Sequence, residues 1–372
     1  MVPAKDEAER LPHLVASLAD QRDEDGRPLA PSAYEVVVLL NNCRDGSAEA
    51  LRQSARRHPR LRVHAAEVSL EPPHAHVGRA RQLLFDTAAA RLAALDRPDG
   101  LVLTTDADTR VPPDWIASAQ AEIEGGVDAV GGRVCLDAAE RAALPPAVRR
   151  LFLLDVGYRR ALEEVRSLYA PEPHDPFPRH HQHFGACLAV TAGAYLRAGG
   201  MPLVRSSEDV ALVRAVQAAG GRVRHSYRFR ATTSARRAGR AEGGLADAFG
   251  WWHEQARLGR PVLVESAAAA ERRLAALGRW LRDEPNGAPP AALLQPPEPP
   301  PEAEADEIGR VLRDLRTAAA RLRPLPLGSR LAEHVSPDVR GAGANPSARN
   351  AQALPPDFAA AVTTDAAARL SA

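Results

Sequence analysis

Asp106 and Asp108 are the residues of this sequence that are best placed to do chemistry. They follow the apolar run Leu101-Val102-Leu103, which predicts a short buried strand. Residues two apart in extended chain face the same side, so both carboxylates are expected at one point beyond a strand end. Such a pair suits Mg²⁺ or Mn²⁺ carrying a diphosphate. Two aspartates that merely cap the next helix would give the same pattern.

Four further segments place polar side chains at a predicted strand end or helix start. Asparagine after a strand can read the edge of a base, and arginines at a helix N-terminus suit a base or a phosphate. Taken singly, each segment is as compatible with a turn, a helix cap or a solvated basic surface. The segments are Val2–Glu7, Leu40–Ser47, Val77–Arg81 and Ser206–Val210.

The last of these segments can supply a base. Asp209 at a rigid helix start could remove a hydroxyl proton, with Glu208 beside it contacting the acceptor or holding the geometry. The structural alternative is a capping box formed by Ser206 and Asp209. In the same way, Ser47 is expected to cap the helix that follows Asp45-Gly46.

The first half of the chain alternates strand-like runs with helix-like spacing, which favours βαβ units and a parallel sheet. The expected strands are Val36–Leu40, Leu61–His64, Leu101–Thr105, Ala129–Val134, Phe184–Val190 and Arg222–Phe229. The expected helices are Glu7–Ala19, Ser47–Arg57, Val77–Leu95, Pro113–Glu124, most of 140–170, Gly193–Ala198, Glu208–Ala219, Ser266–Arg282 and Glu304–Leu322.

The order of these segments resembles the family 2 glycosyltransferases of GT-A fold. The resemblance spans roughly residues 1–240 and is carried by P-x-K-D-E, N-N-C-R-D-G-S, G-R-A-R, D-A-D, G-A-C-L-A-V and S-E-D-V-A-L. It implies an α/β fold with a mostly parallel central sheet flanked by helices. It also implies a nucleotide-diphosphate sugar donor, Mn²⁺ or Mg²⁺, and transfer with inversion.

The resemblance also implies roles by position. Asp209 would be the general base, with Glu208 beside it, and Asp108 would hold the metal together with Asp106. Arg236, in a T-S-A-R-R block like that of some soluble members, could clamp the diphosphate or an anionic acceptor. The donor would contact Pro3, Glu7, Asn41, Arg79 and Asp106, and the acceptor side would hold Gly185, Ala186 and His183.

The sequence departs from the family pattern in three respects. Asn41-Asn42 replaces the usual acidic residues, the first strand is nearly missing, and no Q-x-x-R-W motif or transmembrane helix follows. The last departure argues against a processive membrane synthase. Two other functions remain as alternatives: a nucleotidyltransferase that makes sugar nucleotides, which would want a glycine-rich phosphate loop, and a non-catalytic sugar-nucleotide-binding protein.

Two other groups of residues have more than one interpretation. His180-His181-Gln182-His183 predicts a loop over the acceptor pocket rather than a zinc site, because no cysteine pair accompanies it. Trp251 and Trp252 are expected to pack C-terminal helices rather than to stack on sugar.

Composition sets outer limits on the class of protein. The chain of 372 residues has a net charge of +1, which gives no indication of nucleic acid as a partner, and three separated cysteines, as expected in a reducing cytoplasm. We expect a catalytic domain over 1–260, a helical extension with a Pro-rich linker over 261–323 and a disordered tail over 324–372. The acceptor is left open among a lipid, a polysaccharide and a small molecule, and contact with a membrane surface is compatible with the sequence.

Overall fold

Two sheets meet edge to edge in the computed structural model, which describes residues 1–236, 239, 243–284, 289–296 and 299–323. The predicted tail lies outside these residues. The first sheet is parallel, with the strand order β1-β2-β3, and the second has the order β4-β6-β5-β7. The strands are β1 (Val2–Ala4), β2 (Val36–Asn41), β3 (Val63–Val68), β4 (Leu101–Thr104), β5 (Ala129–Leu136), β6 (Leu188–Thr191) and β7 (Val223–Thr233).

Main-chain hydrogen bonds join the two sheets. The Met1 nitrogen donates to the Leu103 carbonyl at 2.7 Å, and Thr105 N–H donates to the Met1 carbonyl at 3.2 Å. Strand β4 therefore lies beside β1. In the second sheet β5 and β7 are parallel, whereas β6 runs antiparallel to both of its neighbours. The mostly parallel sheet expected from the sequence is confirmed, with β6 as the exception.

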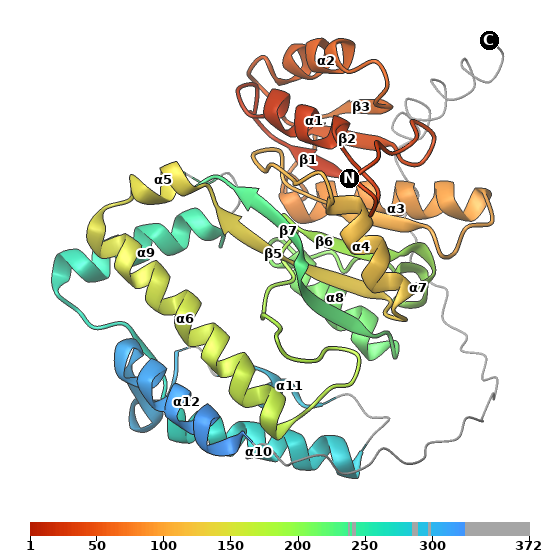
Figure 1. Cartoon of the computed structure of the whole chain (residues 1–372). Coiled ribbons are helices and arrows are strands. Elements are labelled where there is room, and N and C mark those ends of the chain that lie inside the picture. Colours follow the sequence, from red (N-terminus) through yellow and green to blue (C-terminus); the bar gives the residue numbers. More distant parts are fainter. Residues whose placement is uncertain (237–238, 240–242, 285–288, 297–298, 324–372) are drawn as a thin grey trace, which may run out of the picture.

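Helices cover this sheet and continue beyond it (Figure 1). The α/β part carries α1 (Leu11–Ala19), α2 (Ser47–Arg57), α3 (Val77–Ala94), α4 (Trp115–Glu124), α7 (Ala192–Arg197) and α8 (Glu208–Ala218). The remaining helices are α5 (Ala138–Ala142), α6 (Pro146–Tyr169), α9 (Leu245–Leu258), α10 (Ala267–Asp283), α11 (Ala291–Leu294) and α12 (Ile308–Leu322). Two short strands far apart in the sequence, β8 (Leu263–Glu265) and β9 (Ala305–Glu307), pair antiparallel among these helices.

Most predicted elements are present, but some of their bounds differ. Helix α1 begins at Leu11 rather than Glu7, because Glu7–Arg10 form a turn in which the Glu7 carbonyl accepts from Arg10 N–H at 3.0 Å. Strand β6 begins only at Leu188, because Cys187 N–H turns back to the Phe184 carbonyl. Strand β3 lies two residues later than expected, and α9 was not predicted.

The C-terminal helices form a core of their own around α6. Leu274 and Leu277 of α10 and Val311 and Leu315 of α12 are buried in one cluster with Trp252. The expected packing role of Trp252 is confirmed, whereas the side chain of its neighbour Trp251 is exposed. Since α6 follows β5 directly through α5, this helical part is continuous with the sheet that carries the functional residues.

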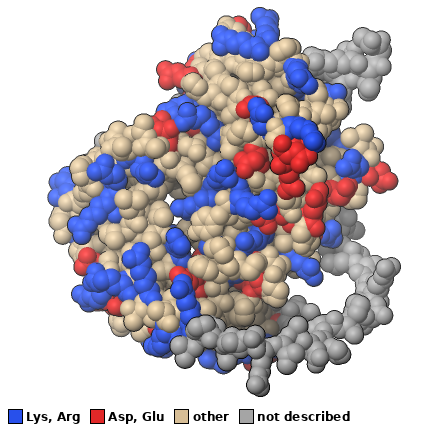
Figure 2. Space-filling view, in the orientation of Figure 1, with Lys and Arg blue, Asp and Glu red and all other residues tan. Residues whose placement is uncertain are grey.

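The surface charge is unevenly distributed despite the small net charge. Figure 2 shows basic side chains over the helical part at lower left and acidic ones gathered at right centre. Helix α12 alone carries Arg310, Arg313, Arg316 and Arg321. Within the described part of the chain, no helix is both long and apolar enough to cross a membrane.

Gly278 of α10 should be intolerant of any side chain. A Cβ atom there would lie 2.1 Å from the Tyr169 carbonyl oxygen at the end of α6, whereas a Cβ at Gly250 of α9 would meet nothing within 4 Å. Alanine is favoured over glycine inside a helix by about 0.5–1 kcal/mol. We expect Gly250→Ala to stabilise the protein by about that amount, and Gly278→Ala to destabilise it by about 1–3 kcal/mol through overpacking. Chemical denaturation measures both, and a stabilising Gly278→Ala would contradict the packing of α10 on α6.

Candidate functional site

Asp106 lies at the carboxyl end of β4, next to a buried arginine. The Arg81 guanidinium donates to Asp106 Oδ1 at 2.6 Å and also to Glu208 Oε1. The Arg81 side chain is 4% exposed and that of Glu208 3%, whereas that of Asp106 is 39% exposed. A buried charge needs a partner of opposite sign, and here one cation serves two carboxylates. Arg81 therefore connects α3, the end of β4 and the start of α8.

Asp108 is held from the other side of the site. Thr233 Oγ1 donates to its Oδ1 at 3.3 Å, and Ser234 Oγ donates to its Oδ2 at 2.5 Å. The Arg236 guanidinium lies 3.3 Å from the same Oδ2 and also donates to Glu7 Oε1 at 2.5 Å. The segment after β7 thus ties the second aspartate to the loop after β1, and it brings Glu7, Asp108 and Arg236 together as a donor site would require.

Asp209 faces the loop that precedes β6. Its Oδ2 accepts from Gly185 N–H at 2.6 Å, and its Oδ1 accepts from Val210 N–H at 2.7 Å. The capping box that was the structural alternative for Ser206 and Asp209 is not formed, because the residue before α8 is Ser207 in a left-handed conformation (φ 58°) that makes no side-chain cap. Asp209 is therefore available for a role other than helix capping.

Asp106, Asp108 and Asp209 are close enough to affect one another. Burial raises the pKa of Asp106; the charges of Asp108 and Asp209 raise it further, and those of Arg81 and Arg236 lower it. Like charges in a confined space favour a shared cation or proton. The structure thus gathers the carboxylates that the sequence singled out into one site.

A cavity of about 480 Å³ opens beside Asp108. Its lining includes Arg10, His13, Arg110 and Ser234. The size is typical of pockets for small molecules. Because Asp108 belongs to its wall, the cavity is part of the same site.

The loops after β1 and β2 form the other end of the site. Pro3 is buried within β1, and the side chain of Asn41 is buried at the end of β2. Asn41 Oδ1 has no hydrogen-bond partner among the residues that the structure describes. Asn42 instead exchanges two hydrogen bonds with the backbone of Leu70, at 3.0 and 3.1 Å. Asn41 is therefore the one of the pair with unused bonding capacity.

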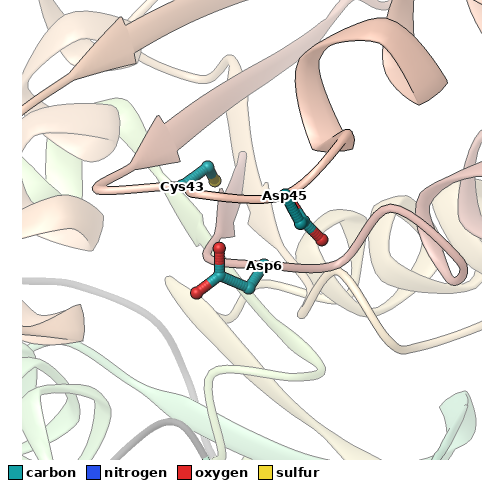
Figure 3. Close-up of side chains that lie close together, drawn as sticks. All are labelled: Asp6, Cys43 and Asp45. Atoms are coloured by element: carbon teal, nitrogen blue, oxygen red, sulfur yellow. The ribbon is translucent and has the colours of Figure 1, made fainter.

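Asp6, Cys43 and Asp45 lie together on these two loops (Figure 3). In the described part of the chain they form a group whose potential metal-ligand atoms lie within 4.8 Å of one another. Asp45 already accepts from Ala8 N–H at 3.0 Å and from Ser47, and Asp6 accepts from Arg44 N–H at 2.7 Å. These contacts account for the group as loop structure. They also correct the predicted role of Ser47, which does not cap α2. Its N–H and its hydroxyl donate to Asp45, and its hydroxyl accepts from Glu7 N–H at 2.8 Å.

Arg79 points to a different neighbourhood from Arg81. Its guanidinium donates to Gln82 Oε1 at 2.7 Å, and its N–H donates to the His76 ring. A contact with the donor remains a prediction for Arg79. Arg81 was missed as a site residue, although the sequence held a signal: it falls on the same helical face as the buried Gly78 and Leu84.

The histidine loop packs against β7. The His183 ring lies 3.2 Å from that of His225, which lies 2.7 Å from Asp175, and His180 contacts the Ser226 carbonyl at 3.1 Å. Gly185 and Ala186, expected on the acceptor side, are buried directly after this loop. The loop thus supports the Gly185–Asp209 contact from behind.

A family model and several solved structures resemble this chain. Residues 1–161 match the family described as Glycosyl transferase family 2. The mannosyltransferase PcManGT from Pyrobaculum calidifontis, in complex with GDP-Man and Mn²⁺, is 19% identical with a TM-score of 0.41, covering 86% of this chain and 83% of that chain. S. aureus TarS 1-349 is 15% identical with a TM-score of 0.40, covering 77% and 72%.

A third similar structure is glucosyl-3-phosphoglycerate synthase from Mycobacterium tuberculosis with Mn²⁺, UDP and phosphoglyceric acid. It is 13% identical with a TM-score of 0.35, covering 71% of this chain and 81% of that chain. No curated protein matches the sequence closely enough to be compared.

The structure has the α/β architecture that the sequence predicted, a mostly parallel sheet flanked by helices. Residues 1–161 match the family 2 glycosyltransferases, the family that the sequence resembles. This result favours sugar transfer over the nucleotidyltransferase and the non-catalytic binding protein.

The buried histidines predict a loss of stability in mild acid. Burial, then the neighbouring His225, lowers the pKa of His180 and of His183 to about 3, against about 6.5 in an unfolded chain. The unfolded state therefore binds protons that the folded state does not, and stability present above pH 6.5 is lost as the pH falls toward 3. Each unit in that window costs up to about 1.4 kcal/mol per histidine.

We expect the melting temperature to fall between pH 7.5 and 5, and to fall less in His183→Gln. The exposed His253 provides the matched control, since His253→Gln should leave the slope unchanged. Equal slopes in the wild type and His183→Gln would show that His183 is not buried in its neutral form.

Proposed function

We propose that this chain is a metal-dependent inverting glycosyltransferase that moves a sugar from a nucleotide-diphosphate donor to an acceptor hydroxyl, with Asp209 as general base. The observation that supports this proposal is the pair of contacts that Arg81 makes with Asp106 of the D-A-D pair and with Glu208, the neighbour of Asp209. Arg236 pairs with Asp108 and Glu7.

The residues present are suited to a divalent cation. Asp106 and Asp108 offer hard carboxylate oxygens, and the described hydrogen bond of Asp106 uses Oδ1 only. Mg²⁺ and Mn²⁺ are commonly held by one or two carboxylates together with substrate phosphates. When bound, the cation would neutralise charge that develops on the departing diphosphate. For Asp108 to take part, Arg236 has to release Oδ2.

The donor would lie across the ends of β1 and β2. Pro3 and Glu7 would border the nucleoside, Asn41 would offer its unpartnered oxygen to a base or ribose, and Arg79 would leave Gln82 to contact the base or phosphates. Arg236, once released from Asp108 and Glu7, can pair with the diphosphate. Asp106 faces the ribose or the sugar.

The acceptor would enter between the end of the histidine loop and α8. Gly185 and Ala186 border it, with His183 behind them. Asp209 takes the proton of the acceptor hydroxyl, whose oxygen attacks the anomeric carbon from the face opposite the diphosphate. One displacement inverts the configuration without a covalent intermediate. Glu208 is buried and paired with Arg81, so it holds geometry rather than contacting the acceptor.

Asp209→Asn should abolish transfer while donor binding survives. The amide keeps the size of the side chain but has no basicity, and a general base contributes about 10²–10⁴-fold to rate. Release of nucleotide from a panel of nucleotide sugars that includes GDP-mannose and UDP-glucose measures the rate, and calorimetry measures donor affinity. A rate within tenfold of the wild type would remove Asp209 as the base.

Mn²⁺ should raise the melting temperature in the presence of a nucleotide sugar, and Asp108→Asn should lose most of that increase. A ligand present at about 100 times its dissociation constant stabilises by about 2.7 kcal/mol, which is about 3–4 °C for a protein of this size. The matched control is Asp45→Asn, which changes an aspartate of the nearby loop group. Full activity in excess chelator, or an equal shift in Asp108→Asn, would contradict the metal role.

A further inference from the structure

Arg81 is a deeply buried cation of the site and contacts two carboxylates. Its guanidinium contacts Asp106 on the donor side and Glu208, which precedes the base. Its Nε has no hydrogen-bond partner among the described residues. A single rigid side chain therefore spans the two halves of the reaction site.

Gly185 packs directly on this guanidinium. A Cβ atom at Gly185 would lie 2.3 Å from Arg81 Cζ, so a larger residue would displace the arginine. The Gly185 N–H is the donor that holds Asp209 at 2.6 Å. Arg81 thus sets how closely the loop before β6 approaches, and that loop in turn orients the base.

Helix α3 also anchors the segment that leads to α8. Gln82 donates to the Met201 carbonyl at 3.1 Å, and the Val204 carbonyl would lie 2.2 Å from a Cβ at Gly78, so the two backbones are in contact. Tyr195 donates to Asp86 and accepts from Met201 N–H at 3.0 Å. Arg81 lies between these anchors, on the face of α3 that is turned to the site.

We propose that Arg81 is a positioning residue of the transfer reaction, which fixes Asp106 and the Glu208–Asp209 pair relative to each other. This inference rests on the proposed function. Arginine suits the role because its planar guanidinium presents several donors in fixed directions, whereas lysine offers one point charge. A displacement of about 1 Å between reacting groups can cost about 10²-fold in rate.

A double-mutant cycle between Arg81 and Glu208 tests the proposal. We expect Arg81→Met and Glu208→Gln each to lower kcat by about 100-fold with a much smaller change in the KM of the donor. The double variant should resemble the worse single variant, because both remove the same link. Arg81→Lys should recover only part of the rate. Gly185→Ala, which leaves Arg81 in the chain but displaces it, should lower kcat about 10-fold or more.

Arg91→Met provides the matched control, since Arg91 is another ion-paired arginine of α3, bound to Glu35 at 2.7 Å far from the reacting groups. It should keep kcat within threefold of the wild type. Hydrogen exchange gives a readout without activity: the amides of 185–187 and 208–211 should lose protection in Arg81→Met and not in Arg91→Met.

Three results would overturn the role of Arg81: wild-type kcat in Arg81→Met, additive losses in the cycle, or unchanged protection at 185–187. A wild type that turns over none of the nucleotide sugars would instead count against the proposed function. The exchange experiment would then still report whether Arg81 holds the loop and α8 together.

Discussion

Five carboxylates converge where the strands of this enzyme end, and their mutual repulsion is the constraint that shapes the site. Glu7, Asp106, Asp108, Glu208 and Asp209 come from three separate segments of the chain. Two unit charges about 4 Å apart interact by about 4 kcal/mol near a protein surface. Such a group stays folded and ionised only if cations lie within it, and Arg81 and Arg236 each bridge two of the acids. Two arginines offset only part of the charge of five carboxylates, so the folded site keeps an excess of negative charge that would favour a cation.

The spacing of apolar residues predicted the strands and helices of the α/β part well, because in these elements the apolar positions are the ones that are buried. The limits of α2 match the prediction at both ends, and β2 and β4 differ by one residue, since each has clear turn chemistry beside it. Elements set by tertiary contacts were predicted less well. The run from Phe184 reads as strand, yet its first residues turn because Gly185 is held by Asp209 and Arg81. Helix α9 was overlooked because its apolar face is needed only against α6.

The site shows the same division. The sequence singled out both aspartates of D-A-D, Glu7, Asp209 and Arg236 from motif order and strand ends, and the structure places Arg236 against Glu7 and Asp108. It selected Arg79 and overlooked Arg81, although the two are separated by one residue. Residues two apart on a helix point to nearly opposite sides. Which of Arg79 and Arg81 enters the site therefore depends on which side of α3 is buried. A charged residue in line with Gly78 and Leu84 was the available signal.

The two arginines, Arg81 and Arg236, differ in the exposure of their side chains, and this difference distinguishes the two halves of the site. The Arg81 side chain is 4% exposed, whereas that of Arg236 is 26% exposed and belongs to the segment after the last long strand. Removing a buried cation from its partners leaves uncompensated charge, so Arg81 has no alternative position, while Arg236 can exchange Asp108 and Glu7 for other anions in contact with water. The link between Asp106 and α8 is therefore fixed. The link between Asp108 and the loop after β1 is exchangeable, and that is the side where a diphosphate and its cation would have to enter.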